Sequence, residues 1–243
     1  MNVAGIKEAV RLCIDEEAAD ISNLNGVDAN DCTYMDNIIT GKIPAALRWI
    51  TLYAPAETLS GVSSSSSDDN ESESETTPGT IDIVVEESHT LSAEANVVNN
   101  LIEPDETLIR VVRVKHASWH RAILGDSLIK EDSDEYLQLR DDNGAAATIE
   151  RPQAALINTK KKAVEVWPAT IGVVKLTYIR ALTDADLSGI VDETTVNLPV
   201  SVETSFIYYL AYLVCCAYGD GRAKSMFEIA TMNLGKTDDK QRQ

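Results

Sequence analysis

Apolar side chains recur at helical spacing near the start of the chain, which predicts several helices there. Residues 3–24 place an apolar side chain every three or four positions and should form an amphipathic helix. A short helix at 34–39 should end at Gly41, because glycine disfavours helix interiors. Pro44 fits the first turn of a further helix, where the N–H that proline lacks would have no partner.

Two more helices are predicted near the end of the chain. The first, 201–218, is apolar on nearly every side, so burial on several faces is expected, in a bundle or against neighbouring subunits. Ser201 can cap its free amides, and Gly219 should end it in a left-handed conformation. Asp220 can cap the second helix, which Gly235 should end.

The middle of the chain carries strand patterns. Residues 108–116 are rich in β-branched side chains and are the strongest strand signal. Other runs predict a strand at 81–85 and an antiparallel pair at 164–168 and 173–178. The runs that predict short strands or connections are 136–139, 147–149 and 154–157.

Together these elements predict an α+β fold. It should be a helical bundle of N-terminal helices and a C-terminal helix hairpin, with an antiparallel β-sheet or β-hairpin subdomain between them. The expected order is N-terminal helices at 1–59, a disordered acidic Ser-rich loop at 60–79, a β-rich subdomain at 80–180, a helix hairpin packing with the N-terminal helices at 181–235 and a flexible tail at 236–243.

Charge is unevenly distributed along the chain. The formal net charge is −18, and residues 49–109 hold thirteen acidic side chains and no Lys or Arg. The Ser-rich part of this block, 60–79, is too polar to bury a core, so a mobile surface loop is expected. Binding of nucleic acid by charge needs clustered Lys and Arg, and the sequence offers no such footprint.

Motifs for catalysis, cofactors and metals are missing from the sequence. It has no Walker-type loop, GxGxxG, HExxH, GxSxG or CxxC pattern. His116 and His120 are four residues apart, but on the predicted strand this spacing separates them by about 13 Å. Cys215 and Cys216 are interpreted as small core residues. We expect no enzyme activity, no cofactor and no metal site.

Membrane insertion is not expected either. No apolar run approaches the roughly 18 residues that a membrane span needs, and the start of the chain lacks the pattern of a signal peptide. A reduced, intracellular origin agrees with adjacent cysteines that are poorly placed to pair.

The order of elements resembles a known family. After the N-terminal helices come a polar turn and apolar strand at 104–114, a tryptophan at Trp119 and an aromatic-proline strand end at 166–168. A strand with an aromatic at 176–178 and an Asp…Leu-Pro turn then lead into paired helices. This order resembles the head–tail connector, or adaptor, proteins of short-tailed double-stranded DNA phages, the tail tubular protein A-like class.

The resemblance implies a structural virion protein. Such proteins form a homo-oligomeric ring, commonly of twelve copies, in the neck of the particle, and the ring would assemble in the host cytoplasm. It would bind the portal protein, carry the tail or nozzle protein and continue the channel through which genomic DNA passes without specific binding. An acidic chain lining that channel would repel DNA.

Candidate interface residues lie in two places. The apolar helix supplies Phe206, Tyr209 and Leu213, and the resemblance makes the tail a candidate docking arm with Lys236, Lys240 and Arg242. The tail could instead be a frayed end. Two other functions stay open: another phage neck or capsid-associated structural protein, and an intracellular α+β enzyme or ligand-binding domain. An enzyme should have a concave pocket with converging polar groups in the monomer.

Overall fold

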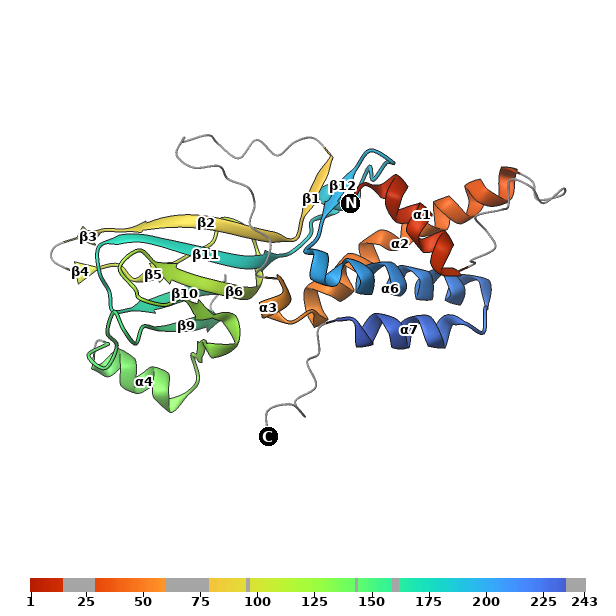
Figure 1. The fold of residues 1–243 in the computed structure, drawn as a ribbon. Helices are drawn as coiled ribbons and strands as arrows, with labels where there is room; N and C mark the ends of the chain where they lie inside the picture. The colour runs from red at the N-terminus through yellow and green to blue at the C-terminus, as the bar shows by residue number, and fades with distance from the viewer. Residues whose placement is uncertain (15–28, 60–78, 95–96, 143, 159–161, 235–243) are drawn as a thin grey trace. The chain divides into compact units, whose positions relative to one another are not determined.

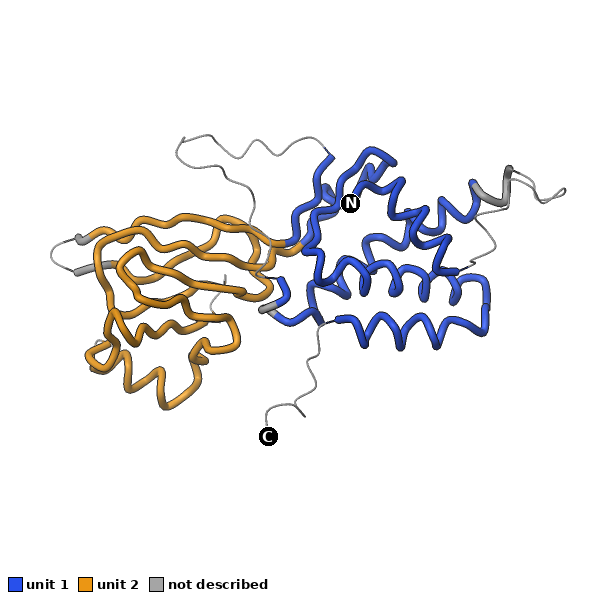
Figure 2. The backbone as a smooth tube through the Cα atoms, in the orientation of Figure 1, with its two compact units in different colours: residues 1–83, 182–243 blue, residues 84–181 orange. Residues whose placement is uncertain are grey.

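The computed structural model contains both helices and β-sheets, which confirms the α+β class. It describes residues 1–14, 29–59, 79–94, 97–142, 144–158 and 162–234 (Figure 1). The chain divides into two compact units (Figure 2). Unit 1 combines Met1–Ile83 with Leu182–Gln243, and unit 2 is the continuous stretch Val84–Ala181. Residues 60–78 of the expected loop 60–79, residues 15–24 of the first predicted helix and the tail lie outside the described residues.

Unit 1 is built around one long helix. Four helices pack against α6 (Figure 1). The helices of this unit are α1 (Val3–Ile14), α2 (Ala29–Tyr53), α3 (Ala56–Leu59), α6 (Val200–Tyr218) and α7 (Ala223–Met232), with the short α5 (Asp184–Leu187) before α6. Because α6 has neighbours on several sides, its apolar residues are buried around most of its circumference, as its pattern predicted.

The bounds of α6 follow the sequence, but its N-terminal cap does not. Gly219 ends the helix in the left-handed region at φ 68°, which confirms that prediction. The N-cap residue is Pro199, so Ser201 lies inside the first turn and the predicted Ser201 cap is wrong. The Ser201 hydroxyl instead donates to the backbone carbonyl of Thr58, at 2.7 Å.

The predicted cap of the last helix is also displaced. Arg222 is the N-cap residue of α7, so Asp220 lies two residues too early to cap the helix, and its carboxylate accepts the backbone N–H of Arg222 at 2.8 Å. Asp220 therefore stabilises the turn between α6 and α7. The helix ends at Met232, and Gly235 lies outside the described residues.

α2 runs without a break through Gly41 and Pro44, so the predicted end and restart there are wrong. Proline inside a helix removes one backbone hydrogen bond, here to the carbonyl of Thr40. Packing offsets this loss, because one face of α2 is fully buried along the whole stretch. The residues of that face with no exposed surface are Ile39, Ile43, Ala46, Leu47 and Ile50. A local breaker signal is thus overridden by a continuous apolar face.

We expect Gly41→Ala to raise the free energy of unfolding by about 0.5–1 kcal/mol, because Gly41 is exposed, helical and has open space around an added Cβ. The same change at Gly219 should lower it by about 1 kcal/mol, because a side chain is strained at a positive φ. Urea unfolding of both variants measures the two effects. Equal signs would contradict the helical conformation assigned to Gly41.

A small parallel ribbon lies within unit 1. Strand β1 (Thr80–Asp82) pairs with β12 (Thr195–Asn197), and Asn2 forms an isolated bridge with Thr195. The amino group of Met1 also donates to the carbonyl of Val196, at 2.8 Å. The predicted strand 81–85 is interrupted at Ile83, where the chain passes from unit 1 to unit 2.

Unit 2 contains two four-stranded sheets. In the first, β2, β11, β6 and β7 pair in that order, all antiparallel. In the second, β5, β10, β9 and β8 pair in that order, with β8 parallel to β9. The bounds are β2 (Val84–Leu91), β5 (Leu101–Ile102), β6 (Leu108–His116), β7 (Ile123–Leu124), β8 (Ile129–Lys130), β9 (Gln153–Asn158), β10 (Lys162–Trp167) and β11 (Gly172–Arg180); β3 (Ala93–Glu94) and β4 (Val97–Val98) form a separate short pair.

The two sheets share one apolar core, which makes them two layers of a sandwich. Val174, Leu176 and Tyr178 of the first sheet belong to the same buried cluster as Val164 and Val166 of the second. Side chains alternate between the two faces of a strand, so the intervening residues of β10 point to the opposite side of the second sheet. The predicted strands 108–116, 154–157, 164–168 and 173–178 are confirmed.

A helix covers the outer face of the second sheet. Residues 136–139, predicted as a short strand or connection, belong to α4 (Asp134–Asp141), so that prediction is wrong. Ser133 caps this helix by accepting the N–H of Tyr136, at 3.2 Å. Tyr136 and Leu139 share one face of the helix and pack in a second apolar cluster with Trp167 of β10.

Candidate interaction surface

The predicted interface residues differ in how exposed they are in the structure. Phe206 has no exposed surface and belongs to the core of unit 1. Tyr209 and Leu213 lie further along α6 and keep part of their surface exposed. The three cations of the tail, Lys236, Lys240 and Arg242, lie outside the described residues. The exposed part of the candidate interface is thus the second half of α6.

No charged residue occurs between Tyr209 and Tyr218. Cys215 is buried there as predicted, but Cys216 is exposed, so its interpretation as a core residue is wrong. Adjacent residues on a helix point about 100° apart, and only one of the two can face the core. Burial raises the pKa of the Cys215 thiol, which therefore does not behave as an activated nucleophile.

Aromatic side chains from three helices meet beside this half of α6. The rings of Trp49 on α2 and Tyr209 on α6 stack in parallel, with centroids 4.1 Å apart. Tyr212 of α6 contacts Phe227 of α7 at 5.1 Å, and Tyr53 of α2 contacts Trp49 at 6.1 Å. We call these five residues the aromatic face. Such ring pairs add about 0.5–1.5 kcal/mol each beyond the area that they bury.

The phenols of Tyr209 and Tyr212 stay neutral. Burial raises the pKa of Tyr209, and the nearby hydroxyls of Tyr212 and Tyr53 and the thiol of Cys216 raise it further. A hydrogen bond with Cys216 is the main cause of the raised pKa of Tyr212. These groups therefore present apolar rings with neutral polar tips. This chemistry suits protein contacts, in which Trp and Tyr supply much of the binding energy.

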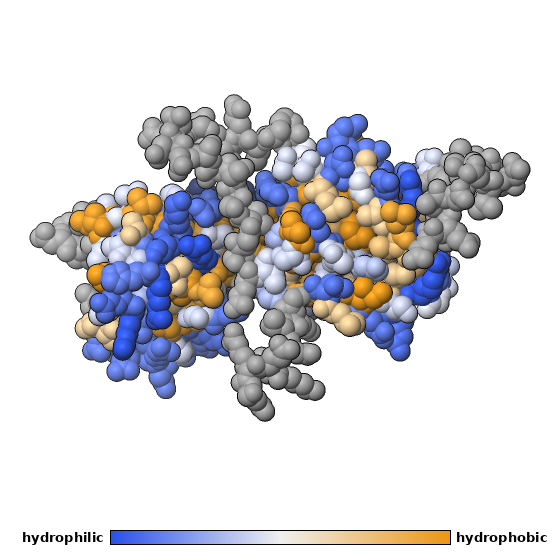
Figure 3. All heavy atoms as spheres, viewed as in Figure 1, coloured by the Kyte–Doolittle hydropathy of each residue, from blue (hydrophilic) through white to orange (hydrophobic). Residues whose placement is uncertain are grey.

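Part of the aromatic face is exposed to solvent. Tyr53 is 61% exposed and Phe227 39%, and Leu52 beside Tyr53 is 59% exposed. Figure 3 shows apolar side chains reaching the surface of unit 1 among polar ones. The pattern of α6 predicted Tyr209 as an interface residue, but Trp49, Tyr53 and Phe227 were not predicted, because their meeting depends on how three helices pack.

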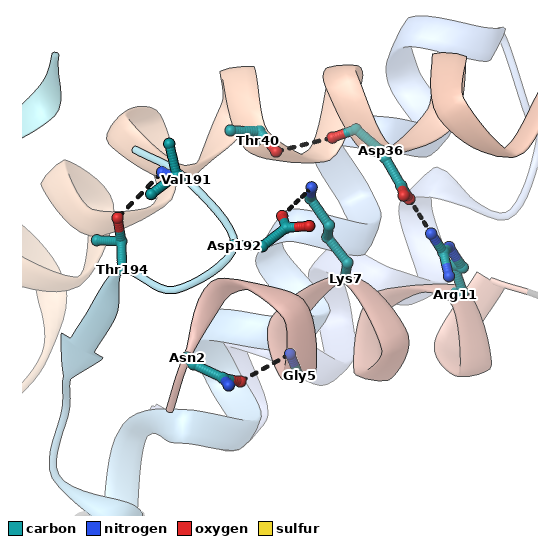
Figure 4. Close-up of polar contacts among 9 residues, drawn as sticks. All are labelled: Asn2, Gly5, Lys7, Arg11, Asp36, Thr40, Val191, Asp192 and Thr194. Atoms are coloured by element: carbon teal, nitrogen blue, oxygen red, sulfur yellow. Dashed lines mark hydrogen bonds and ion pairs between the residues drawn. The ribbon is translucent and has the colours of Figure 1, made fainter. Parts of the chain in front are cut away.

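A second surface of unit 1 is acidic. Residues 182–194, which we call the acidic loop, hold four acidic side chains and no Lys or Arg. Figure 4 shows how the loop is tied to the start of α1: the Lys7 ammonium pairs with Asp192. The backbone N–H of Val3 donates to the carbonyl of Thr194 at 2.9 Å, and that of Ala4 to the carbonyl of Asp192 at 3.2 Å. The loop thereby satisfies free amides at the N-terminus of α1.

The same helix is joined to α2 by a further ion pair. The Arg11 guanidinium donates to the Asp36 carboxylate (Figure 4). The Thr40 hydroxyl donates to the backbone carbonyl of Asp36, one helical turn away, at 2.9 Å. The acidic loop, α1 and the first half of α2 are therefore linked through polar contacts.

In unit 2 a polar cluster lies at the edge of the first sheet. The Tyr178 hydroxyl donates to the Glu87 carboxylate, and Nε2 of His89 lies 2.9 Å from the other Glu87 oxygen. The backbone N–H of Asp105 also donates to Glu87, at 3.3 Å. Burial and the contact with Glu87 strongly raise the pKa of Tyr178, so this phenol is a poor base and nucleophile. The cluster is interpreted as a structural bond between β2 and β11.

The two histidines considered for metal binding lie in different surroundings. His116 is the last residue of β6 and is 1% exposed, whereas His120 is exposed and lies beyond the strand, contrary to the expected strand placement. Nδ1 of His116 accepts the N–H of Ser118 at 3.0 Å. Among the described residues, no group of three or more His, Cys, Asp or Glu side chains could hold a metal ion.

We expect the protein to lose stability as the pH falls below about 6.5, because burial lowers the pKa of His116, although a hydrogen bond with Thr170 partly offsets this. A group whose folded pKa is depressed binds its proton more readily when unfolded. Its contribution is therefore present above the unfolded value and is lost as the pH falls toward the folded one. Urea unfolding at several pH values measures this, and His116→Asn should flatten the slope. If the unfolding free energy of His116→Asn depended on pH as strongly as that of the parent, His116 would not be the group responsible.

One described helix, α6, is long and apolar enough to cross a membrane by length and composition alone. This corrects the expectation that no segment approaches that length. A core helix of a globular protein meets the same criterion, and α6 packs against α1, α2, α3 and α7.

Comparison of the chain with known protein families and with curated proteins finds no match.

Proposed function

We propose that this chain is a structural virion protein, a head–tail connector or adaptor of a short-tailed double-stranded DNA phage. In this proposal the copies form a ring in the neck of the particle, bind the portal protein on one side and carry the tail or nozzle protein on the other. The family arrangement of a helical bundle with a C-terminal hairpin is part of the same proposal.

The observation that supports it is the division of the chain. Helices from both ends of the sequence pack around α6, and the continuous stretch Val84–Ala181 forms a separate β-rich unit. This agrees with the order of elements that resembles the connector class. The uncharged second half of α6 and the aromatic face are both partly exposed, and such surfaces are features of a protein that buries more surface in an assembly than it does alone.

Charge supports the same function. A chain with a net charge of −18 has no electrostatic affinity for DNA and would let a genome slide past without adhering. We expect no retention of double-stranded DNA on a filter at low salt, the condition that favours charge-driven binding most. Salt-dependent retention would contradict a passive channel.

Native mass spectrometry with negative-stain imaging tests the proposal. We expect a closed ring of about a dozen 26.5 kDa chains, formed alone or on a portal protein, because a head-to-tail ring can need its template to close. A chain that stays monomeric and also fails to bind a ring of the portal protein would refute the connector function. A chain that forms a ring only when the portal protein is added would support the connector function and identify the portal as the template.

A further inference from the structure

We infer that the aromatic face of one copy binds the acidic loop of a second copy, so that copies join head to tail. The inference rests on the proposed function and deepens it by naming the two surfaces and the partner. Two different surfaces on one chain give a heterologous contact, the kind that builds rings.

The first surface combines exposed rings with positive charge. Residues 37–53 of α2 contain Lys42 and Arg48 and no acidic residue, in a chain that carries 39 acidic and 21 basic side chains. Lys42 is partly exposed and lies two turns before Trp49 on the same side of α2. Arg48 is exposed and lies one turn before the exposed Leu52, on the side of α2 next to that of Trp49. The surface is therefore suited to a partner that offers carboxylates together with apolar side chains.

The acidic loop offers both. Asp184 and Glu193 are exposed, and Val191 between them is 55% exposed. The loop is also held in place, because Asp192 pairs with Lys7 and the backbone of the loop bonds the start of α1. A surface that is already ordered loses little conformational entropy on binding.

Geometry agrees with a contact between copies rather than within one. The acidic loop adjoins α1, whereas the aromatic face reaches α7, and these two helices lie on opposite sides of α6 (Figure 1). One copy therefore presents the two surfaces in different directions. Because the whole chain is strongly acidic, copies repel one another at a distance, and association requires local complementarity of this kind.

Charge reversal with rescue tests the inference in the full chain. We expect Arg48→Glu to weaken self-association about tenfold or more, and the double variant Asp184→Lys with Glu193→Lys to do the same, because each places like charges in contact. The triple variant reverses both surfaces and should restore association. Native mass spectrometry over a concentration series, at low and high salt, measures all four proteins. Loss without rescue in the triple variant would overturn the charge pairing.

Two further variants keep the test specific. Arg121→Glu makes the same charge change at an exposed site in unit 2 and should leave self-association unchanged, so an equal loss there would show an effect of net charge alone and overturn the inference. Tyr53→Ala should weaken association without altering its salt dependence. Circular dichroism checks that each variant is folded.

The outcomes separate the inference from the connector function. Rings that persist in Arg48→Glu and Tyr53→Ala would overturn the inference and leave the connector intact. Association through these residues without binding to a portal would support the inference and refute the connector. Monomers that bind a portal through the aromatic face would overturn the inference and assign this face to the portal.

Discussion

Phe206→Asp should unfold unit 1. Phe206 has no exposed surface and lies in the centre of α6, which four other helices of the unit contact. Removing the ring alone costs about 3–5 kcal/mol, as in other buried Phe→Ala changes. A carboxylate in its place adds an unpaired charge in an apolar surrounding. Together these two costs are comparable with the whole stability of a typical domain, about 5–15 kcal/mol.

Hydrogen exchange measured on the full chain can locate the effect. Amides of α2 and α6 should lose their protection in Phe206→Asp, and Phe206→Ala should show a smaller loss on the same amides. Thr204→Asp serves as the matched control, because Thr204 is exposed on the same helix near its N-terminus, where a negative charge is tolerated or favourable. Its stability should stay within about 0.5 kcal/mol of the parent. Protected α6 amides in Phe206→Asp would contradict the placement of this residue.

Local patterns predicted the elements whose physics is local. The apolar circumference of α6 follows from the spacing of its side chains. Its end follows from Gly219, because glycine adopts a positive φ without strain. Strand β6 follows from a run of β-branched residues, which suit an extended backbone. These features depend on residues close in sequence, so one sequence is enough to predict them.

The errors arise where distant packing overrides a local signal. Gly41 and Pro44 both disfavour a helix interior, yet α2 continues because its other face is buried against the unit. Leu137 and Leu139 have the two-residue spacing of a strand, but the cap at Ser133 and the apolar side of the second sheet favour a helix, on which Tyr136 and Leu139 share the buried face. In both cases the deciding partner lies elsewhere in the sequence.

Packing between distant segments is also the reason why the sequence predicted only part of the aromatic face. Tyr209 and Leu213 could be found from the pattern of α6, but Trp49 and Phe227 belong to helices whose approach is a tertiary result. The parallel pairing of β1 with β12 joins residues more than a hundred positions apart, and a short strand carries no signal of its partner. The sequence predicted only a turn before the paired helices where the acidic loop lies, and it carried no signal for the attachment of this loop to α1.

Gly125→Ala should lower the stability of unit 2 by about 3 kcal/mol or more, because the added Cβ has no room. It would lie 1.8 Å from the backbone oxygen of Val111 and 2.8 Å from the carbonyl carbon of the same residue. The obstacle is backbone, so no side-chain rotation can relieve the contact. Strand β6 has an irregular register opposite Thr177 and Tyr178, where Val112 is left without a partner on β11. The irregularity of β6 therefore lies next to the residue whose carbonyl approaches Gly125.

To relieve the clash between the added Cβ and the Val111 carbonyl, β6 would have to move. Its position is fixed by neighbouring strands on both sides. The strand pairs with β11 and β7, and Val111 and Val112 are both buried. Urea unfolding followed by tryptophan fluorescence, from Trp49 in unit 1 and from Trp119 and Trp167 in unit 2, measures the change in both units. Gly41→Ala is the control of equal chemistry, since its Cβ meets open space and should have the opposite sign. An unchanged midpoint for Gly125→Ala would mean that the turn after β7 can leave the strand without cost. The sandwich would then tolerate a side chain at the place where the backbone of Gly125 meets the Val111 carbonyl.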